Sequence, residues 1–279
     1  EFRRVLFRSI GIREIFMAHV ISVVNQKGGV GKTTTTVSVA SLLHDLFQKR
    51  VLVVDLDPQA NATSGLGIEK NTCNKCIYDV LISSAEISDV IQSTEPGGLS
   101  VLPSSIQLAG AEIELVGELS RETKLKRALS PVLGYYDYIL IDCPPSLGLL
   151  TINALTACSK VLVPLQCEYF ALEGLSQLLH TIQLVEADLN PQIQILGILL
   201  TMANHRTNLT SQIIEEVHEH FPEHVFNTVI SRNVRISEAP SHGIPINRYD
   251  PKASGTQHYS EFTQELVECL HPKEHSVAV

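Results

Sequence analysis

The chain has 279 residues, a formal net charge of -9 and a hydrophobic fraction of 44%. This length and composition suffice for a full hydrophobic core, and no apolar run approaches the roughly 18 residues that a membrane-spanning helix needs. The negative charge excludes a protein that holds nucleic acid through its overall charge, so any such binding would need a local basic patch.

The first sixteen residues fit the rest of the chain poorly. Four arginines, the first at Arg3 and the last at Arg13, alternate with apolar residues, and no continuous apolar segment or small-residue cleavage site of a signal peptide follows. We interpret residues 1–16 as a non-native or disordered extension. We place the native start at Met17, because the first predicted strand begins two residues later. We expect one domain over residues 17–279, because no linker, low-complexity tract or internal repeat interrupts the sequence there.

A strand, a glycine-rich loop and a helix follow one another near the start of this domain. Residues 19–25 are β-branched and largely apolar, which is typical of a parallel strand buried on both faces. Residues 27–34 read Lys-Gly-Gly-Val-Gly-Lys-Thr-Thr, a deviant form of the phosphate-binding loop, and residues 33–46 carry apolar side chains at helical spacing. Loop N–H groups and the positive end of the helix dipole then converge on one point, which predicts a nucleoside triphosphate site.

Each residue type in this loop has a chemical reason to be there. Glycines let the backbone approach phosphate oxygens without a Cβ clash, Lys32 would reach the β and γ phosphates, and the Thr33 hydroxyl would ligate Mg²⁺. The alternative is a glycine-rich turn that binds nothing. Lys27 is redundant at a single phosphate site, which suggests that it acts elsewhere. The three glycines are Gly28, Gly29 and Gly31.

A second buried strand, within residues 50–59, ends in two carboxylates, Asp55 and Asp57. Ligands in open parallel sheets bind at the carboxyl ends of the strands, so both side chains should lie beside the loop. A carboxylate there can orient the attacking water, and we assign this task to Asp55. Asp57 precedes a proline and fits a turn-capping residue better. We expect the polar residues 61–67 to form a flexible loop of the kind that senses a γ-phosphate.

The six cysteines are scattered and lie mostly in apolar segments, which indicates a reduced, cytoplasmic protein rather than a disulfide framework. Cys73 and Cys76 form a lone C-x-x-C pair. A second pair at zinc-ligand spacing is missing from the sequence, so a metal or redox role is the weaker interpretation.

Further along the chain, an apolar strand over residues 136–142 ends in Asp142. This is the form expected of a Walker-B acid, which holds Mg²⁺ directly or through water. The pattern also predicts two short helices within 77–92, strands at 99–103, 160–165, 194–201 and 225–230, and helices at 106–115, 121–133, 172–187, 209–220 and 261–270. Strands that alternate with helices predict an α/β fold, a doubly wound and mostly parallel sheet with helices on both faces.

Four blocks in the same order resemble the ParA/Soj group of partitioning ATPases, within the deviant Walker-A class that also contains MinD and the nitrogenase iron protein. The blocks are residues 27–34, 55–65, 141–148 and 233–243. The resemblance implies a Mg²⁺-dependent ATPase that uses ATP and forms a homodimer, in which the first lysine of the loop crosses to the partner's phosphates. That would explain Lys27.

The resemblance also implies roles for single residues. Thr33 would bind Mg²⁺, Thr34 would contact the phosphates, Asp55 would position water, and the segment that holds Asn233 would close over the adenine. The chain departs from the family pattern at Ser231, where relatives usually carry proline.

Members of the group bind double-stranded DNA without sequence preference, and a ParB-like protein stimulates hydrolysis. By motif position the DNA contacts would be Arg206 and Arg232, which implies a nucleoid-associated protein; several glutamates lie close to Arg206 in sequence, so a surface or capping role is the alternative. Two other functions remain open. A MinD-like membrane regulator would need an amphipathic, basic C-terminus, which residues 271–279 lack, and an iron–sulfur carrier or reductase would place cysteines at a dimer axis.

Overall fold

The computed structural model describes residues 18–69, 73–94, 98–168, 171–204 and 206–272. The expected extension over residues 1–16 and most of the C-terminal tail lie outside these residues. Seven strands form one sheet in the order β3-β4-β2-β5-β1-β6-β7, parallel throughout except for the β3–β4 pair. The strands are β1 (His19–Val23), β2 (Val51–Asp55), β3 (Gln92–Ser93), β4 (Ser100–Leu102), β5 (Tyr138–Asp142), β6 (Lys160–Gln166) and β7 (Gln194–Thr201).

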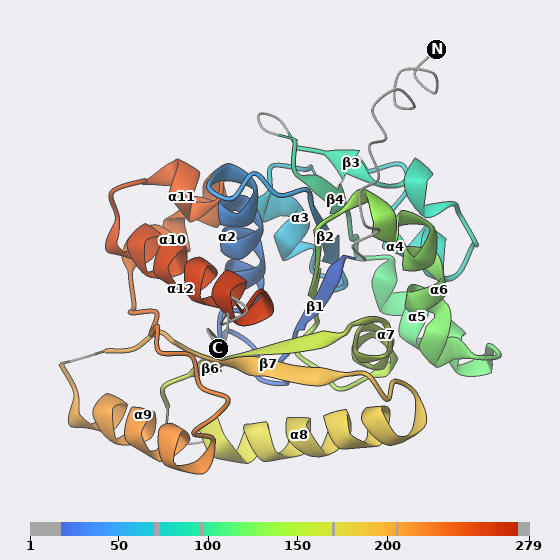
Figure 1. The fold of residues 1–279 in the computed structure, drawn as a ribbon. Coiled ribbons are helices and arrows are strands. Elements are labelled where there is room, and N and C mark those ends of the chain that lie inside the picture. Colours follow the sequence, from blue (N-terminus) through green and yellow to red (C-terminus); the bar gives the residue numbers. More distant parts are fainter. Residues whose placement is uncertain (1–17, 70–72, 95–97, 169–170, 205, 273–279) are drawn as a thin grey trace, which may run out of the picture.

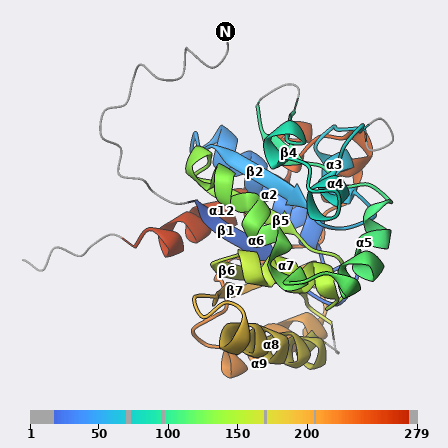
Figure 2. The same ribbon diagram turned by 90° about the vertical axis from the view of Figure 1, so that its right-hand side faces the viewer.

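Helices cover both faces of this sheet, which confirms the predicted doubly wound α/β fold (Figures 1 and 2). In the part of the chain that is described, none of them is long and apolar enough to cross a membrane. The α-helices are α2 (Lys32–Asp45), α3 (Asn61–Gly65), α4 (Ile77–Leu81), α5 (Leu108–Glu114), α6 (Lys124–Leu129), α7 (Leu149–Ala157), α8 (Ala171–Asp188), α9 (Asn208–His220), α10 (Val234–Glu238), α11 (Ile246–Tyr249) and α12 (Ser254–Leu270).

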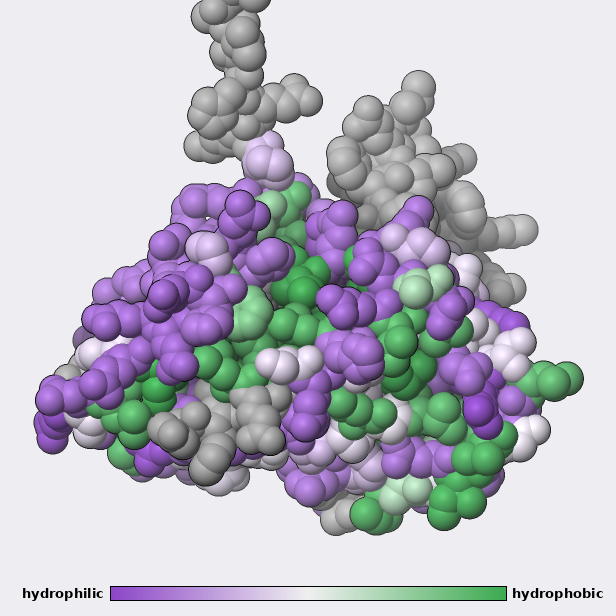
Figure 3. Space-filling view, turned by 90° about the horizontal axis from the view of Figure 1, so that it is seen from below, coloured by the Kyte–Doolittle hydropathy of each residue, from purple (hydrophilic) through white to green (hydrophobic). Residues whose placement is uncertain are grey.

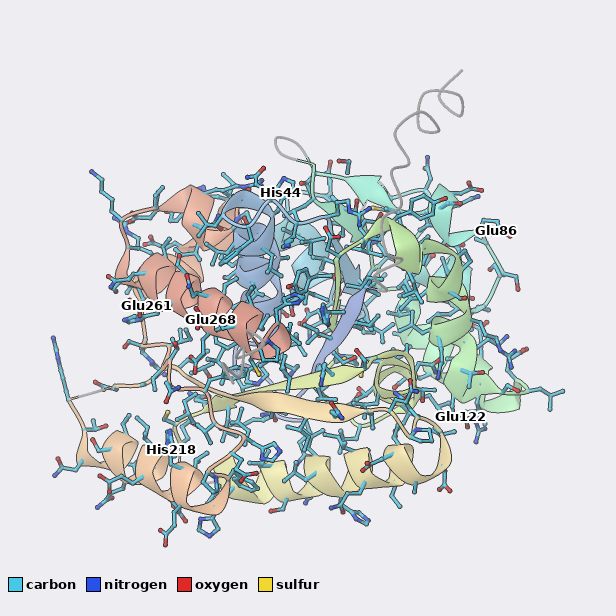
Figure 4. The ribbon with its side chains drawn as sticks, viewed as in Figure 1. His44, Glu86, Glu122, His218, Glu261 and Glu268 are labelled. Carbon is cyan, nitrogen blue, oxygen red and sulfur yellow. The ribbon has the colours of Figure 1, made fainter. Side chains whose placement is uncertain are left out.

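Two hydrophobic cores lie on opposite faces of the sheet, because successive strand residues point to opposite sides. Val20 of β1 packs in one core with side chains of α6, α7 and α8, and Ile21 packs in the other with side chains of α2 and α12. All strand residues of β2 and β5 are buried. Most charged side chains instead lie at the surface, as do Glu261 and Glu268 on α12, which Figure 4 labels.

The predicted strand over residues 225–230 is wrong. This segment runs beside β7 but forms one isolated bridge with it, Ile198 with Val225, and two further backbone bonds, in which Phe226 and Ile230 donate to the carbonyls of Ile198 and Leu200 at 3.0 and 2.9 Å. Between these two bonds, the backbone N–H groups of Asn227 and Thr228 turn away from β7 and donate to the carboxylate of Glu265 on α12, at 2.7 and 3.0 Å. A side chain from a distant helix therefore replaces the sheet partner.

Two local predictions also change. The predicted helix at 121–133 is divided into a 3₁₀ turn, α6 and a second 3₁₀ segment that begins before Pro131. Residues 61–65, expected to be a loop, form the short helix α3. The α3 helix is fixed at its centre because the backbone N–H of Thr63 donates to the carboxylate of Asp55.

Gly197 in β7 leaves the space that the Phe226 ring occupies. A Cβ at this position would lie 2.5 Å from a ring carbon of Phe226, whose ring meets that of Phe262 edge to face at 4.9 Å. We expect Gly197→Ala to lower the free energy of unfolding by about 1–3 kcal/mol through overpacking, measured by urea denaturation. Gly117→Ala is the control, because a Cβ there meets nothing within 4 Å; equal stability of the two variants would contradict the expectation.

Candidate functional site at the phosphate loop

The glycine-rich loop leaves the end of β1 and is held from below by side chains of its neighbours. The buried amide of Asn25 donates to the backbone carbonyl of Pro164 at 2.8 Å and accepts the N–H of Lys27 at 2.9 Å. On the other side, the Thr201 hydroxyl donates to the carbonyl of Val30 at 2.8 Å. The loop is thus tied to β6 and β7, so its backbone N–H groups have a fixed direction.

Two glycines of the loop have backbone conformations that other residues rarely adopt. Gly29 has a φ of 76° and Gly31, which precedes the first residue of α2, has a φ of 92°. Gly28 has no such need, since a Cβ there would meet Pro145 at an ordinary contact distance of 3.8 Å. The backbone conformation therefore requires glycine at two of the three glycine positions in the loop.

The two lysines of the loop lie in different environments. Lys32 is 6% exposed, and its ammonium group donates to the carbonyl of Lys27 at 3.0 Å, so its side chain lies over the loop. Burial lowers the pKa of Lys32, against the attraction of Asp142. The side chain of Lys27 is 44% exposed and forms an ion pair with Glu168. One lysine lies inside the loop and the other at its mouth.

Thr33 and Asp142 lie side by side, as a shared Mg²⁺ site requires. The Thr33 hydroxyl donates to the Asp142 carboxylate at 2.7 Å. Asp142 is fully buried, and burial together with nearby Asp55 raises the pKa of its carboxyl well above the usual range. These oxygen donors fit Mg²⁺, which takes one or two protein ligands together with phosphate oxygens and water. Among the described residues, none form a cluster of three or more His, Cys, Asp or Glu that could hold a metal alone.

Asp55 has a structural task at the end of β2. It is fully buried, one oxygen accepts the N–H and hydroxyl of Thr63 at 2.8 and 2.7 Å, and the other accepts the N–H of Asp57 at 3.1 Å. Burial raises the pKa of Asp55 to about 6, although these hydrogen bonds act in the opposite direction. Both oxygens of Asp55 are therefore engaged by the protein.

Asp57 is the better placed carboxylate. It caps the following turn, as its position before Pro58 predicts, because one oxygen accepts the N–H of Gln59 at 2.9 Å. Its other oxygen has no hydrogen-bond partner within the described ranges, and 7% of the residue is exposed. Asp57 is also close enough to Lys32 to raise the pKa of that lysine. Sequence reasoning underrated Asp57 because the local turn signal explained it.

A cavity of about 290 Å³ opens beside the loop and is bordered by Gly31 and Thr34. Asn233 lines this cavity, and its amide caps α10 by accepting the N–H of Arg235 and donates to the hydroxyl of Ser254, both at 2.8 Å. The sequence did not indicate that Thr201 at the end of β7 and Tyr259 of α12 also line this cavity. The lining residues are Gly31, Thr34, Thr201, Met202, Ile230, Ser231, Arg232, Asn233, Ile236, Ser237 and Tyr259.

The two arginines predicted to contact DNA are exposed and come from adjacent segments. The backbone N–H of Arg232 donates to the carbonyl of Ala203 at 3.0 Å, and Arg206 lies three residues beyond Ala203. In the part of the chain that the structure covers, neither arginine forms an ion pair, whereas Arg235 pairs with Glu238 at 2.8 Å. Arg232 also lines the cavity described above.

The neighbouring helix α9 carries the opposite charge. Three of its glutamates are exposed, and hydrophilic residues prevail on the side of the molecule where α9 lies (Figure 3). A nucleic acid that approaches the arginines would therefore pass an acidic border, which confines any contact to a small area. The glutamates are Glu215, Glu216 and Glu219.

The parallel sheet, the deviant phosphate loop and the adjacent Thr33 and Asp142 define a P-loop ATPase, and a family model described as an AAA domain matches residues 18–195. The chain is 58% identical to the sporulation initiation inhibitor protein Soj of Bacillus subtilis, over 90% of this chain and 99% of that protein. It is 50% identical to the chromosome partitioning protein ParA of Myxococcus xanthus, over 92% and 90% of the two chains. The chain belongs to the ParA/Soj family of chromosome-partitioning ATPases.

Solved structures show the same fold. Cobyrinic acid a,c-diamide synthase from Mycobacterium smegmatis, with bound ADP and magnesium, superposes with a TM-score of 0.80 at 38% identity, over 90% of this chain and 95% of that one. The cell division ATPase MinD of Pyrococcus furiosus superposes with a TM-score of 0.75 at 27% identity, over 90% and 99% of the two chains.

Proposed function

We propose that this chain is a Mg²⁺-dependent ATPase whose two ATP-bound subunits face each other, and that the dimer holds DNA until a ParB-like partner stimulates hydrolysis. Dimerisation then acts as the switch, because the γ-phosphate contributes to the contact between subunits. The observation that carries the proposal is the contrast between the two lysines. Lys32 is buried over the loop, whereas Lys27 is exposed at its mouth, where a second subunit can receive it.

Within one subunit, binding rests on residues that are already held in place. Lys32 neutralises charge on the β and γ phosphates, Thr34 and the loop N–H groups contact phosphate oxygens at the start of α2, and the cavity that includes Asn233 receives adenine. Thr33 and Asp142 hold Mg²⁺, which neutralises charge on the phosphates when it is bound. The ADP and magnesium bound in the structure of the Mycobacterium smegmatis protein support this choice of ligands.

Hydrolysis needs a group that orients water and a group that stabilises the developing charge. We assign the first role to Asp57 in place of Asp55, because Asp57 lies close enough to Lys32 to raise its pKa and has one oxygen without a partner among the described residues, while both oxygens of Asp55 are engaged. Lys27 of the opposite subunit supplies the second, as an arginine finger does in other phosphoryl-transfer enzymes. The reaction is transfer of the γ-phosphoryl group to water.

DNA binding rests on Arg206 and Arg232. Contacts to phosphates carry no sequence information and need only cations that are free to reach the backbone. Because both arginines are exposed and come from adjacent segments, one dimer would present two such pairs. The chain would then be associated with the nucleoid, and either a chromosome or a plasmid could be the cargo.

The other two functions have less support. Cys143, Cys158 and Cys167 are buried inside one subunit, so they are not exposed where two subunits could share an iron–sulfur cluster. A MinD-like membrane role would depend on the C-terminal tail, which lies outside the described residues from position 273. Sedimentation with liposomes and ATP tests it, and clear lipid binding would overturn the DNA proposal.

The DNA proposal is tested by co-sedimentation with DNA in the presence of ATP, ADP or no nucleotide. Wild type should sediment only with ATP, and Arg206→Glu should bind DNA more weakly, with a slope of log affinity against log salt reduced by about 1. Arg206 is the preferred position because it does not line the base cavity. Arg127→Glu on α6 is the matched control, since Arg127 is also exposed and belongs to a different part of the chain from Arg206 and Arg232. DNA binding that is equal in all three proteins, or independent of nucleotide, would refute the proposal.

A further inference from the structure

Lys27 at the mouth of the loop has a partner within its own subunit. Its ammonium group lies 2.5 Å from one carboxylate oxygen of Glu168, and the amide of Gln166 donates to the other oxygen at 2.5 Å. Glu168 comes two residues after the end of β6, and β6 pairs with β1, the strand that leads into the loop. Lys27 and Glu168 are 141 residues apart in sequence, and the sheet brings them together.

The backbone around Lys27 is fixed, so only its side chain can change position. Its N–H donates to Asn25, and its carbonyl accepts the ammonium group of Lys32. The neighbouring Gln26 is tied to the carbonyl of Gly174 in α8 at 3.2 Å. By contrast, the side chains of Lys27 and Glu168 are 44% and 48% exposed. A rotation about the Lys27 side chain is therefore enough to move its charge from Glu168 toward a second molecule.

We propose that Glu168 is a positioning residue that holds Lys27 in its own subunit until a second ATP-bound copy takes the lysine away. The inference rests on the proposed cross-subunit role of Lys27. One ammonium group cannot serve Glu168 and the phosphates of the opposite subunit at the same time, so each dimer that forms must break two of these ion pairs. Glu168 thereby sets how much ATP is needed before subunits associate.

The Lys27–Glu168 ion pair is strong enough to raise the ATP concentration needed for dimerisation and too weak to prevent dimerisation. Ion pairs between exposed side chains are weak, because water and salt screen the charges. The several negative charges of a triphosphate attract the lysine more strongly than a single carboxylate does. Loss of Glu168 should therefore ease dimerisation by a modest factor and leave the fold and the nucleotide site intact.

The first test measures dimer formation by light scattering during a titration with a slowly hydrolysed ATP analogue and Mg²⁺. We expect Glu168→Gln to lower the half-maximal analogue concentration about twofold to fivefold, the range that an exposed ion pair supports. Glu186→Gln is the matched control, because it removes the same charge from an exposed position on α8. Thermal unfolding of both variants should match that of wild type.

The second test detects the ion pair itself. A carbodiimide joins an amine to a carboxylate only when the two touch, so wild type without nucleotide should yield a Lys27–Glu168 cross-link by mass spectrometry. The cross-link should disappear when the analogue drives the subunits together. Persistence of the cross-link in the dimer, or an unchanged or raised midpoint in Glu168→Gln, would overturn the inference alone. Wild type that stays monomeric with the analogue would overturn the proposed function and the inference with it.

Discussion

Replacing Lys27 with alanine is expected to leave ATP binding almost unchanged and to reduce hydrolysis on the order of a thousandfold. Binding should survive because Lys32, the loop N–H groups and the base cavity remain in place. Hydrolysis should fail because a cation supplied across an interface is worth about 10³ to 10⁵ in rate in related phosphoryl-transfer enzymes. Fluorescent nucleotide titration and phosphate release measure the two properties separately.

A mixing experiment shows on which subunit Lys27 acts. Lys27→Ala and Asp57→Ala should each be inactive alone. In a mixed dimer, the Lys27→Ala subunit keeps its own Asp57 and receives Lys27 from its partner. Equal amounts should recover about a quarter of the wild-type rate, since half of randomly paired dimers are mixed and each holds one complete site. Normal turnover of Lys27→Ala alone, or no recovery on mixing, would contradict the cross-subunit role.

The two aspartates after β2 should respond differently to alanine. Asp57→Ala should lower hydrolysis about 10² to 10⁴-fold, the usual contribution of a positioned acid–base group, and trap an ATP-bound dimer. Asp55→Ala should mainly lower stability, because the two donors of Thr63 and the N–H of Asp57 lose their acceptor inside the protein. A buried unsatisfied polar group costs about 1–3 kcal/mol, so a loss of several kcal/mol is expected in urea denaturation.

Stability and ATP hydrolysis both have to be measured for Asp57→Ala and for Asp55→Ala. Asp55→Asn is the control, because it keeps an acceptor oxygen for Thr63 while removing the charge, and it should be more stable than Asp55→Ala. A well-folded Asp55→Ala protein that binds ATP, dimerises and fails to hydrolyse it would restore Asp55 to the role first expected from the sequence. Full activity in Asp57→Ala would exclude Asp57.

The parts of the molecule that the sequence predicts well are those in which a short stretch determines its own structure. Residues 51–55 and 138–142 are apolar up to a terminal aspartate, and both are completely buried strands. The glycines of the loop, with Lys32 and Thr33 at the start of α2, likewise form a local unit. Burial of β-branched side chains and the geometry of a tight turn fix these features without help from distant residues.

The features that could not be predicted from the sequence depend on contacts between distant segments. Residues 225–230 have the composition of a strand, but Glu265 in α12 takes two of their backbone N–H groups. The difference between Asp55 and Asp57 depends on Thr63, which the chain places at the same strand end only when α3 folds. Lys27 could be recognised as surplus, but its partner Glu168 could not, because adjacency of β1 and β6 exists only in the folded sheet.

The position of Arg232 has a consequence for timing. Arg232 lines the base cavity. Its backbone N–H donates to the carbonyl of Ala203, which precedes Arg206 by three residues. Under the proposed function, one short segment would border the adenine and also present a cation to the DNA backbone. The identity of the base would then affect how long DNA is held, so a nucleotide with another base could be hydrolysed and still fail to keep the cargo bound.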